Sequence, residues 1–206
     1  MNFQFVKRCS LIALMLFFAA TTFAQLTKDE KKMVSKNLKA TLKVLQKSVK
    51  GLSEAQLNFK AAPDKWSIKE CVYHLAISET NLWGWAQGTL AAPANPDKRK
   101  DIKMTDEKLL AGVEDRTNKV KTGENFEPKN AKWASVPEAM KFLKEERQKH
   151  IDALKSSTED YRNHVAEQSP VGPIDAYQVI LLMSAHTVRH SKQIDEVKAS
   201  AGYPAN

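Results

Sequence analysis

Residues 175–198 read DAYQVILLMSAHTVRHSKQIDEVK. Asp175 followed three residues later by Gln178 matches the capping-box spacing that begins a helix. Apolar side chains and two histidines then recur every three or four residues, which predicts one inward-facing side of a helix. The residues of this side are Leu182, His186, His190, Gln193, Ile194 and Val197. We therefore expect a long helix over about 175–199 whose histidines face the protein interior.

Three more long helices are expected on the N-terminal side of this stretch. Each follows a Ser or Thr that has Glu three residues later, and each carries an apolar stripe at helical spacing. The expected ranges are about 28–50, 67–90 and 136–156, with a short turn at 53–57. No long segment alternates apolar and polar residues as a strand would.

The connection between the second and third long helices is long. Pro93, Pro96 and the charged run 97–103 indicate an exposed connection, a helical segment is expected at about 105–122, and 123–133 is expected to be a loop. These features predict an all-α fold, a four-helix bundle with a long crossover between the second and third long helices.

The first 24 residues have the pattern of a signal peptide. Lys7 and Arg8 precede an uncharged apolar run, Leu11–Ala20, and Thr22-Phe23-Ala24 offers small residues for cleavage before Gln25. The apolar run is shorter than the roughly 20 residues that span a bilayer, although an uncleaved membrane anchor is the alternative interpretation. We expect residues 1–24 to be removed and the protein to be exported, to the periplasm or the medium.

The mature chain, residues 25–206, suits one domain with a sizeable core. It would carry 30 basic and 24 acidic residues, a net charge of +6, and one cysteine, Cys71. No intrachain disulfide is therefore expected. No later apolar stretch is long enough to cross a membrane, so we expect no stable membrane insertion after cleavage.

A candidate metal site comes from three histidines. His186 and His190 are four residues apart, which places both on one helix face, and His74 lies in WSIKECVYHLAISE, residues 66–79, on the second long helix. Three imidazoles can hold one divalent cation and leave coordination positions open, as catalytic metal sites do. The alternative is that each is a core histidine with a single hydrogen bond. We interpret His150 and His164 as surface residues.

Imidazole nitrogen favours zinc or nickel, and iron or manganese remain open. Among neighbouring residues, Asn81 and Gln193 are candidates to orient a ligand, whereas Glu70 is expected to cap its helix. Cys71 is expected to be a buried thiol rather than a ligand. Arg189 is expected to form an intrahelical or surface ion pair.

Other chemistries are not indicated. The sequence contains no G-x-S-x-G, no phosphate-binding glycine loop and no C-x-x-C. Lysines line one face of the first helix: Lys28, Lys32, Lys36, Lys39, Lys43, Lys47 and Lys50. Because no aromatic residues or groove-binding motif accompany them, we expect a solvated face and no nucleic-acid partner.

Three segments resemble the DinB/YfiT-like superfamily. They are KSVKGLSEAQLNFKAAPDKW, PDKWSIKECVYHLAISE and GPIDAYQVILLMSAHTVRHSKQIDEVK, in that order along the chain. The resemblance implies a four-helix bundle that holds a divalent metal ion with three histidines, here His74, His186 and His190. It also implies activities such as thiol-dependent transfer, isomerisation and hydrolysis, so it predicts the site better than the reaction.

Two functions follow as hypotheses. The first is an exported metal-dependent hydrolase or thiol-type transferase that acts on a small molecule. The alternative is a non-catalytic metal-binding or interaction protein, favoured if a fourth protein ligand or packed apolar side chains close the metal site. A homodimer is compatible with either.

Overall fold

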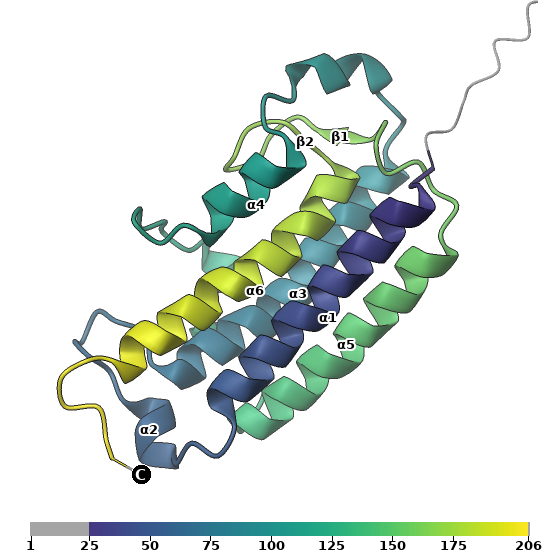
Figure 1. The fold of residues 1–206 in the computed structure, drawn as a ribbon. Coiled ribbons are helices and arrows are strands. Elements are labelled where there is room, and N and C mark those ends of the chain that lie inside the picture. The colour runs from purple at the N-terminus through teal and green to yellow at the C-terminus, as the bar shows by residue number, and fades with distance from the viewer. Residues whose placement is uncertain (1–24, 206) are drawn as a thin grey trace, which may run out of the picture.

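The computed structural model describes residues 25–205, so the expected signal peptide, 1–24, lies outside the described residues. The predicted all-α four-helix bundle is confirmed (Figure 1). Its long helices are α1 (Lys28–Val49), α3 (Ile68–Ala91), α5 (Val136–Ser156) and α6 (Ala176–Lys198). The shorter helices are α2 (Glu54–Asn58), α4 (Asp106–Glu114), η1 (Pro96–Asp101), η2 (Glu124–Phe126) and η3 (Pro128–Asn130). Two short antiparallel strands, β1 (Val165–Ala166) and β2 (Ile174–Asp175), pair just before α6.

Capping hydrogen bonds begin the helices where the sequence indicates. Ser67 and Asp175, at the starts of α3 and α6, each form a full capping box, with both the side chain and the backbone of the cap residue engaged. These caps determine where each helix begins and therefore which side chains face inward.

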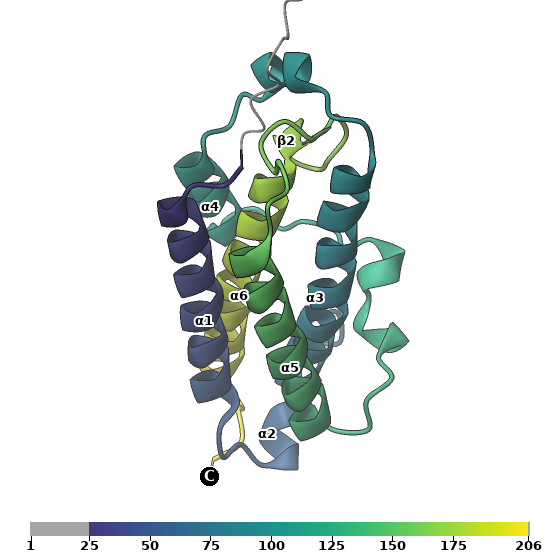
Figure 2. The ribbon, with the colours of Figure 1, turned by 90° about the vertical axis from the view of Figure 1, so that its right-hand side faces the viewer.

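The helices are arranged so that α1 and α3 each pack against both α5 and α6. The crossover, residues 92–135, returns the chain to the end of the bundle at which α3 began, so α3 and α5 run in the same direction (Figure 2). This confirms the predicted long crossover. On its way the chain passes along the outer side of α6 and α3, where α4 packs against α6 and η2 and η3 pack against α3.

Two apolar clusters form the core, one towards each end of the bundle. One includes Leu38, Leu82 and Met183, and the other includes Leu45 and Ile194. Along α3, α5 and α6, the residues between the two clusters are largely polar, and they place Glu79, Arg147, His150 and Thr187 in the buried middle of the bundle. The bundle is therefore apolar at both ends and polar in the middle.

Two predictions about the fold are wrong. The helix expected over 105–122 ends at Glu114, because the Asp115 carboxylate accepts hydrogen bonds from the backbone N–H and hydroxyl of Thr117 and turns the chain. His150 is buried rather than on the surface, and His164 is half-buried, with its ring Nδ1 3.2 Å from the Thr89 carbonyl oxygen.

Two surface predictions can also be compared with the structure. The seven lysines on one face of α1 are all exposed, as expected for a solvated face. Within residues 25–205, none of the helices has the length and apolar character needed to cross a membrane.

Candidate metal centre

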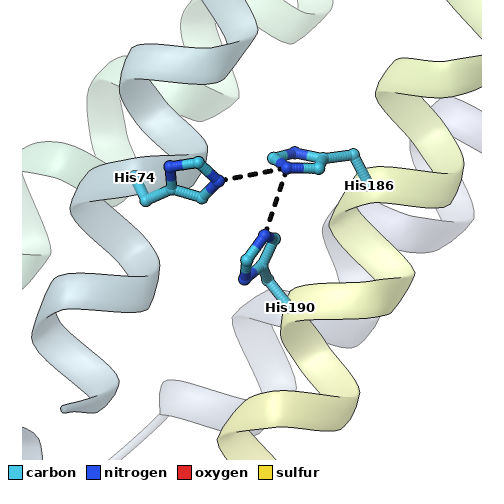
Figure 3. A group of neighbouring side chains, drawn as sticks. All are labelled: His74, His186 and His190. Carbon is cyan, nitrogen blue, oxygen red and sulfur yellow. Dashed lines mark hydrogen bonds between the residues drawn. The ribbon is translucent and has the colours of Figure 1, made fainter. Parts of the chain in front are cut away.

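His74 of α3 meets His186 and His190 of α6, as the sequence predicts (Figure 3). Nε2 of His186 lies 3.0 Å from Nε2 of His74 and 3.1 Å from Nε2 of His190. The three nitrogen atoms lie within 4.8 Å of one another. Two nitrogens bound to one tetrahedral zinc ion, each at 2.0–2.1 Å, are about 3.4 Å apart, so this spacing fits a shared cation.

Hydrogen bonds determine which nitrogen of two imidazoles faces the centre. Nδ1 of His74 lies 2.7 Å from the carbonyl oxygen of Phe126, and Nδ1 of His190 lies 2.9 Å from Oε1 of Gln193. Because both oxygens are acceptors, each Nδ1 must donate a proton, and each Nε2 then presents a lone pair to the centre. Convergent lone pairs repel one another unless a cation or a proton lies between them, so the donor set fits a metal ion.

The electrostatic surroundings keep the imidazoles neutral. Burial lowers the pKa of His74 to about 4, and burial together with the neighbouring imidazoles lowers the pKa values of His186 and His190 well below the ordinary range. His74 and His190 are only 3 % and 6 % exposed, whereas His186 is half-buried. At neutral pH the site therefore offers neutral imidazoles, the form that binds metal ions.

The indole ring of Trp66 closes one side of the centre. Its centroid lies 5.8 Å from that of His190 with the planes 22° apart, and 4.8 Å from that of His74. Trp66 directly precedes Ser67, the cap of α3, so the same turn that begins the helix also places the indole against two of the three histidines. This packing restricts the ring orientations without supplying a further ligand.

The three histidines line a cavity of about 1100 Å³. Its walls come from the first turns of α3 and the segment before it, from parts of residues 112–129 of the crossover and from α6. Apolar contacts come from Trp66, Phe126 and Leu182, and most of its charged residues are basic. A cavity of this size accommodates a small molecule next to the imidazoles.

The structure also shows the contacts of the other residues for which the sequence predicted a role. Gln193 contacts His190 as predicted, and Glu70 caps α3 as predicted. Asn81 instead donates a hydrogen bond to the carbonyl oxygen of Asn125. Cys71 is a buried thiol, and burial raises its pKa to about 12. Arg189 binds backbone carbonyl oxygens at the end of α4 and in the segment after it, so the ion pair predicted for it is wrong.

Sequence reasoning missed Arg116 and the Phe126 carbonyl. Arg116 Nη1 donates to Oε1 of Gln193 at 3.2 Å, and its Nε and Nη2 donate to the Glu196 carboxylate at 2.6 and 2.8 Å. Gln193 Oε1 thus accepts from both Arg116 and His190. No local pattern marks these two residues, because both lie in the crossover and reach His74 and Gln193 only through the tertiary fold.

The fold and the site together define a class of protein: a four-helix bundle with three convergent imidazoles on facing helices, open to a cavity. The chain belongs to the DinB superfamily, whose family model matches residues 37–194. The matched residues include all three histidines.

Two proteins from Bacillus subtilis are similar to this chain, one in sequence and one in fold. The uncharacterized protein YuaE of strain 168 is 29 % identical over 150 residues, which cover 73 % of this chain and 88 % of YuaE. The structure of YfiT, described as a probable metal-dependent hydrolase with an unusual four-helix bundle topology, matches with a TM-score of 0.59 at 18 % identity. That match covers 87 % of this chain and 91 % of YfiT, and it supports the fold.

Proposed function

We propose that this protein is an exported metalloprotein that uses a divalent cation to hydrolyse a small molecule or to transfer a thiol to it. His74, His186 and His190 would hold the cation. The observation that carries the proposal is the convergence of the three Nε2 atoms, two of them deprotonated because of their Nδ1 hydrogen bonds. Zinc or nickel suits imidazole ligands best, with iron or manganese as alternatives.

A bound cation of this kind lowers the pKa of a ligating nucleophile and polarises a carbonyl oxygen. The chain contributes the positions of its own groups. Phe126 and Gln193 hold the rings of His74 and His190, while Trp66 packs against both. Half-buried His186 borders the cavity, and this is where a small molecule would approach.

The carboxylates that line the cavity bear on which reaction is favoured. Asp64 is paired with Lys65, Glu70 with Lys60, and Glu127 with Lys129. Lys65 lowers the pKa of Asp64, and lysines already engage the other two carboxylates, so none of the three is free to act as a general base. This favours a nucleophile that ionises readily, such as a thiol with a pKa of about 8.5, over water.

The non-catalytic alternative depends on a closed site. The group of potential ligands among residues 25–205 consists of the three histidines without a fourth His, Cys, Asp or Glu, and a cavity adjoins them. Both observations favour a site that admits a small molecule.

The test begins with elemental analysis of natively purified protein. We expect about one divalent ion per chain, and we expect His186→Ala to lose most of it. His164→Ala is the matched control, because His164 lies outside the group of three. Equal metal content in the two variants would overturn the assignment.

Activity is tested with ester, amide and thiol-transfer substrates on metal-loaded protein. Turnover should disappear in His190→Ala. Turnover that survives this substitution would belong to another site, and a loaded protein without turnover on any substrate class would support the binding-only alternative.

Export is tested separately, by N-terminal sequencing, which should find Gln25 as the first residue.

A further inference from the structure

The cavity over the histidines has a strongly basic lining. Eight of its lining residues are lysine or arginine and three are aspartate or glutamate. The three carboxylates are each bound to a lysine. Of the remaining five basic groups, Arg116 is paired with Glu196. The other four leave an excess of positive charge around the opening, and such a field attracts small anions.

Two of these basic groups lie near each other. Lys65 precedes α3 and Lys119 follows α4, both line the cavity, and each is close enough to affect the pKa of the other. Lys65 is bound to Asp64 at 2.9 Å, and the charge of the same carboxylate also acts on Lys119. The proximity of Lys65 lowers the pKa of Lys119. An oxyanion between the two ammonium groups would remove their repulsion.

The segment that carries Lys119 is attached to α6 next to the histidines. Arg189, which directly precedes His190, donates hydrogen bonds to the carbonyl oxygens of Val113, Asp115 and Asn118. Arg116 in the same segment contacts Gln193, the partner of His190. These bonds hold the basic wall of the cavity at a defined position relative to the three imidazoles.

We infer that the cavity selects a small anionic molecule whose carboxylate or phosphate group binds at Lys65 and Lys119 while its reacting end lies at the three histidines. Only the placement of the reacting end at the histidines rests on the proposed function. The anion site consists of groups outside the candidate metal centre. Trp66, Phe126 and Leu182, which also line the cavity, would contact the less polar part of such a molecule.

The first experiment uses metal-free protein and isothermal titration calorimetry at low ionic strength. The probes are succinate and inorganic phosphate, with uncharged succinamide as the reference. At least one anion should bind more tightly than succinamide, and the double variant Lys65→Gln/Lys119→Gln should weaken its binding about tenfold. The anion that binds more tightly shows whether the site prefers a carboxylate or a phosphate group.

The matched control is Lys36→Gln/Lys43→Gln, which removes the same charge from the exposed face of α1. It should bind the anions like the unchanged protein. Equal affinities in the two double variants, or no preference for the anions over succinamide, would overturn the anion site.

The second experiment connects the two ends of the cavity. Cobalt-loaded protein is titrated with 6-mercaptohexanoate and with the neutral 6-mercapto-1-hexanol, and the thiolate-to-cobalt absorption band is followed. The carboxylate should increase affinity about tenfold, and Lys65→Gln/Lys119→Gln should remove that advantage. Equal affinities for the two thiols would contradict the inference. A protein that binds no cobalt would instead contradict the proposed function, while the calorimetry still decides the anion site.

Discussion

Two polar clusters that include histidine lie near the middle of the bundle, and they differ in how their charges are balanced. In one, Glu79 accepts hydrogen bonds from Arg147 at 2.7 and 2.6 Å and lies 2.9 Å from Nδ1 of His150. In the other, three imidazoles face one another without a carboxylate. In the first cluster the opposite charges of Glu79 and Arg147 balance each other. In the second, the facing lone pairs of the imidazoles require a cation or a proton between them.

The pKa values reflect this difference. Burial alone would raise the pKa of Glu79, but Arg147 and His150 lower it overall. For His74, burial is the dominant influence and lowers the pKa to about 4. A buried cluster that balances its own charges is typical of structure, and one that gathers like groups around a common point is typical of a ligand site.

The largest expected effect comes from breaking the balanced cluster. Arg147→Met should lower the free energy of unfolding by about 3–5 kcal/mol, because it leaves the Glu79 carboxylate, 1 % exposed, without its main partner. The double variant Glu79→Leu/Arg147→Met should recover part of this loss. Urea denaturation at pH 7.5 measures both. A double variant less stable than Arg147→Met would show that the pair stabilises the fold by more than charge balance.

The pH dependence of the metal-free protein tests the second cluster. An unfolded histidine has a pKa of about 6.5, so between about pH 4 and 6.5 the unfolded chain binds more protons than the folded one and stability falls as pH falls. For His74 alone the loss from pH 7.5 to 5.0 is about 2 kcal/mol. His74→Leu should therefore reduce the pH dependence by this amount. Superimposable profiles for the two proteins would contradict the assigned burial effect.

A smaller effect is expected from the hydrogen bonds that orient the imidazoles. Gln193→Ala removes the acceptor of His190 Nδ1, and loss of such a partner weakens metal binding about tenfold or more. Competition with a chromogenic chelator measures the affinity. The matched control is Gln148→Ala, an amide on α5 that contacts Asp152, and it should bind metal like the unchanged protein.

The smallest effect is expected at an exposed ion pair on the same helix as Arg147. Lys149 and Glu146 lie 2.6 Å apart, but the lysine side chain is 70 % exposed. Water and salt screen such a pair, so Lys149→Met should leave the urea midpoint unchanged. A loss of stability comparable to that of Arg147→Met would mean that burial does not explain why the two ion pairs differ in their contribution to stability.

The helices and the three histidines were predictable because their signals are local. A capping box is completed within four residues, and two imidazoles four residues apart share a helix face whatever surrounds them. The ends of α3, α5 and α6 accordingly lie within a residue or so of the predicted limits. The end of α4 was missed, because the turn made by Asp115 and Thr117 competes with helix continuation over the following residues.

His150 shows what local signals lack. Its position near the end of a charged helix suggested the surface, yet its ring stacks on Trp83 at 4.3 Å and contacts Glu79, both of which come from α3. The contribution of Arg116, Lys119 and Phe126 to the cavity likewise depends on the path of the crossover.

The sequence by itself therefore determined the helices, their inward faces and the histidines that meet. Only the tertiary structure decided what surrounds those histidines: which oxygen atoms orient them, which basic residues form the cavity wall, and which buried charges balance one another. The physical reason is distance along the chain. Hydrogen bonds within a helix turn follow from neighbouring residues, whereas contacts between groups 40 or more residues apart exist only after the helices have packed.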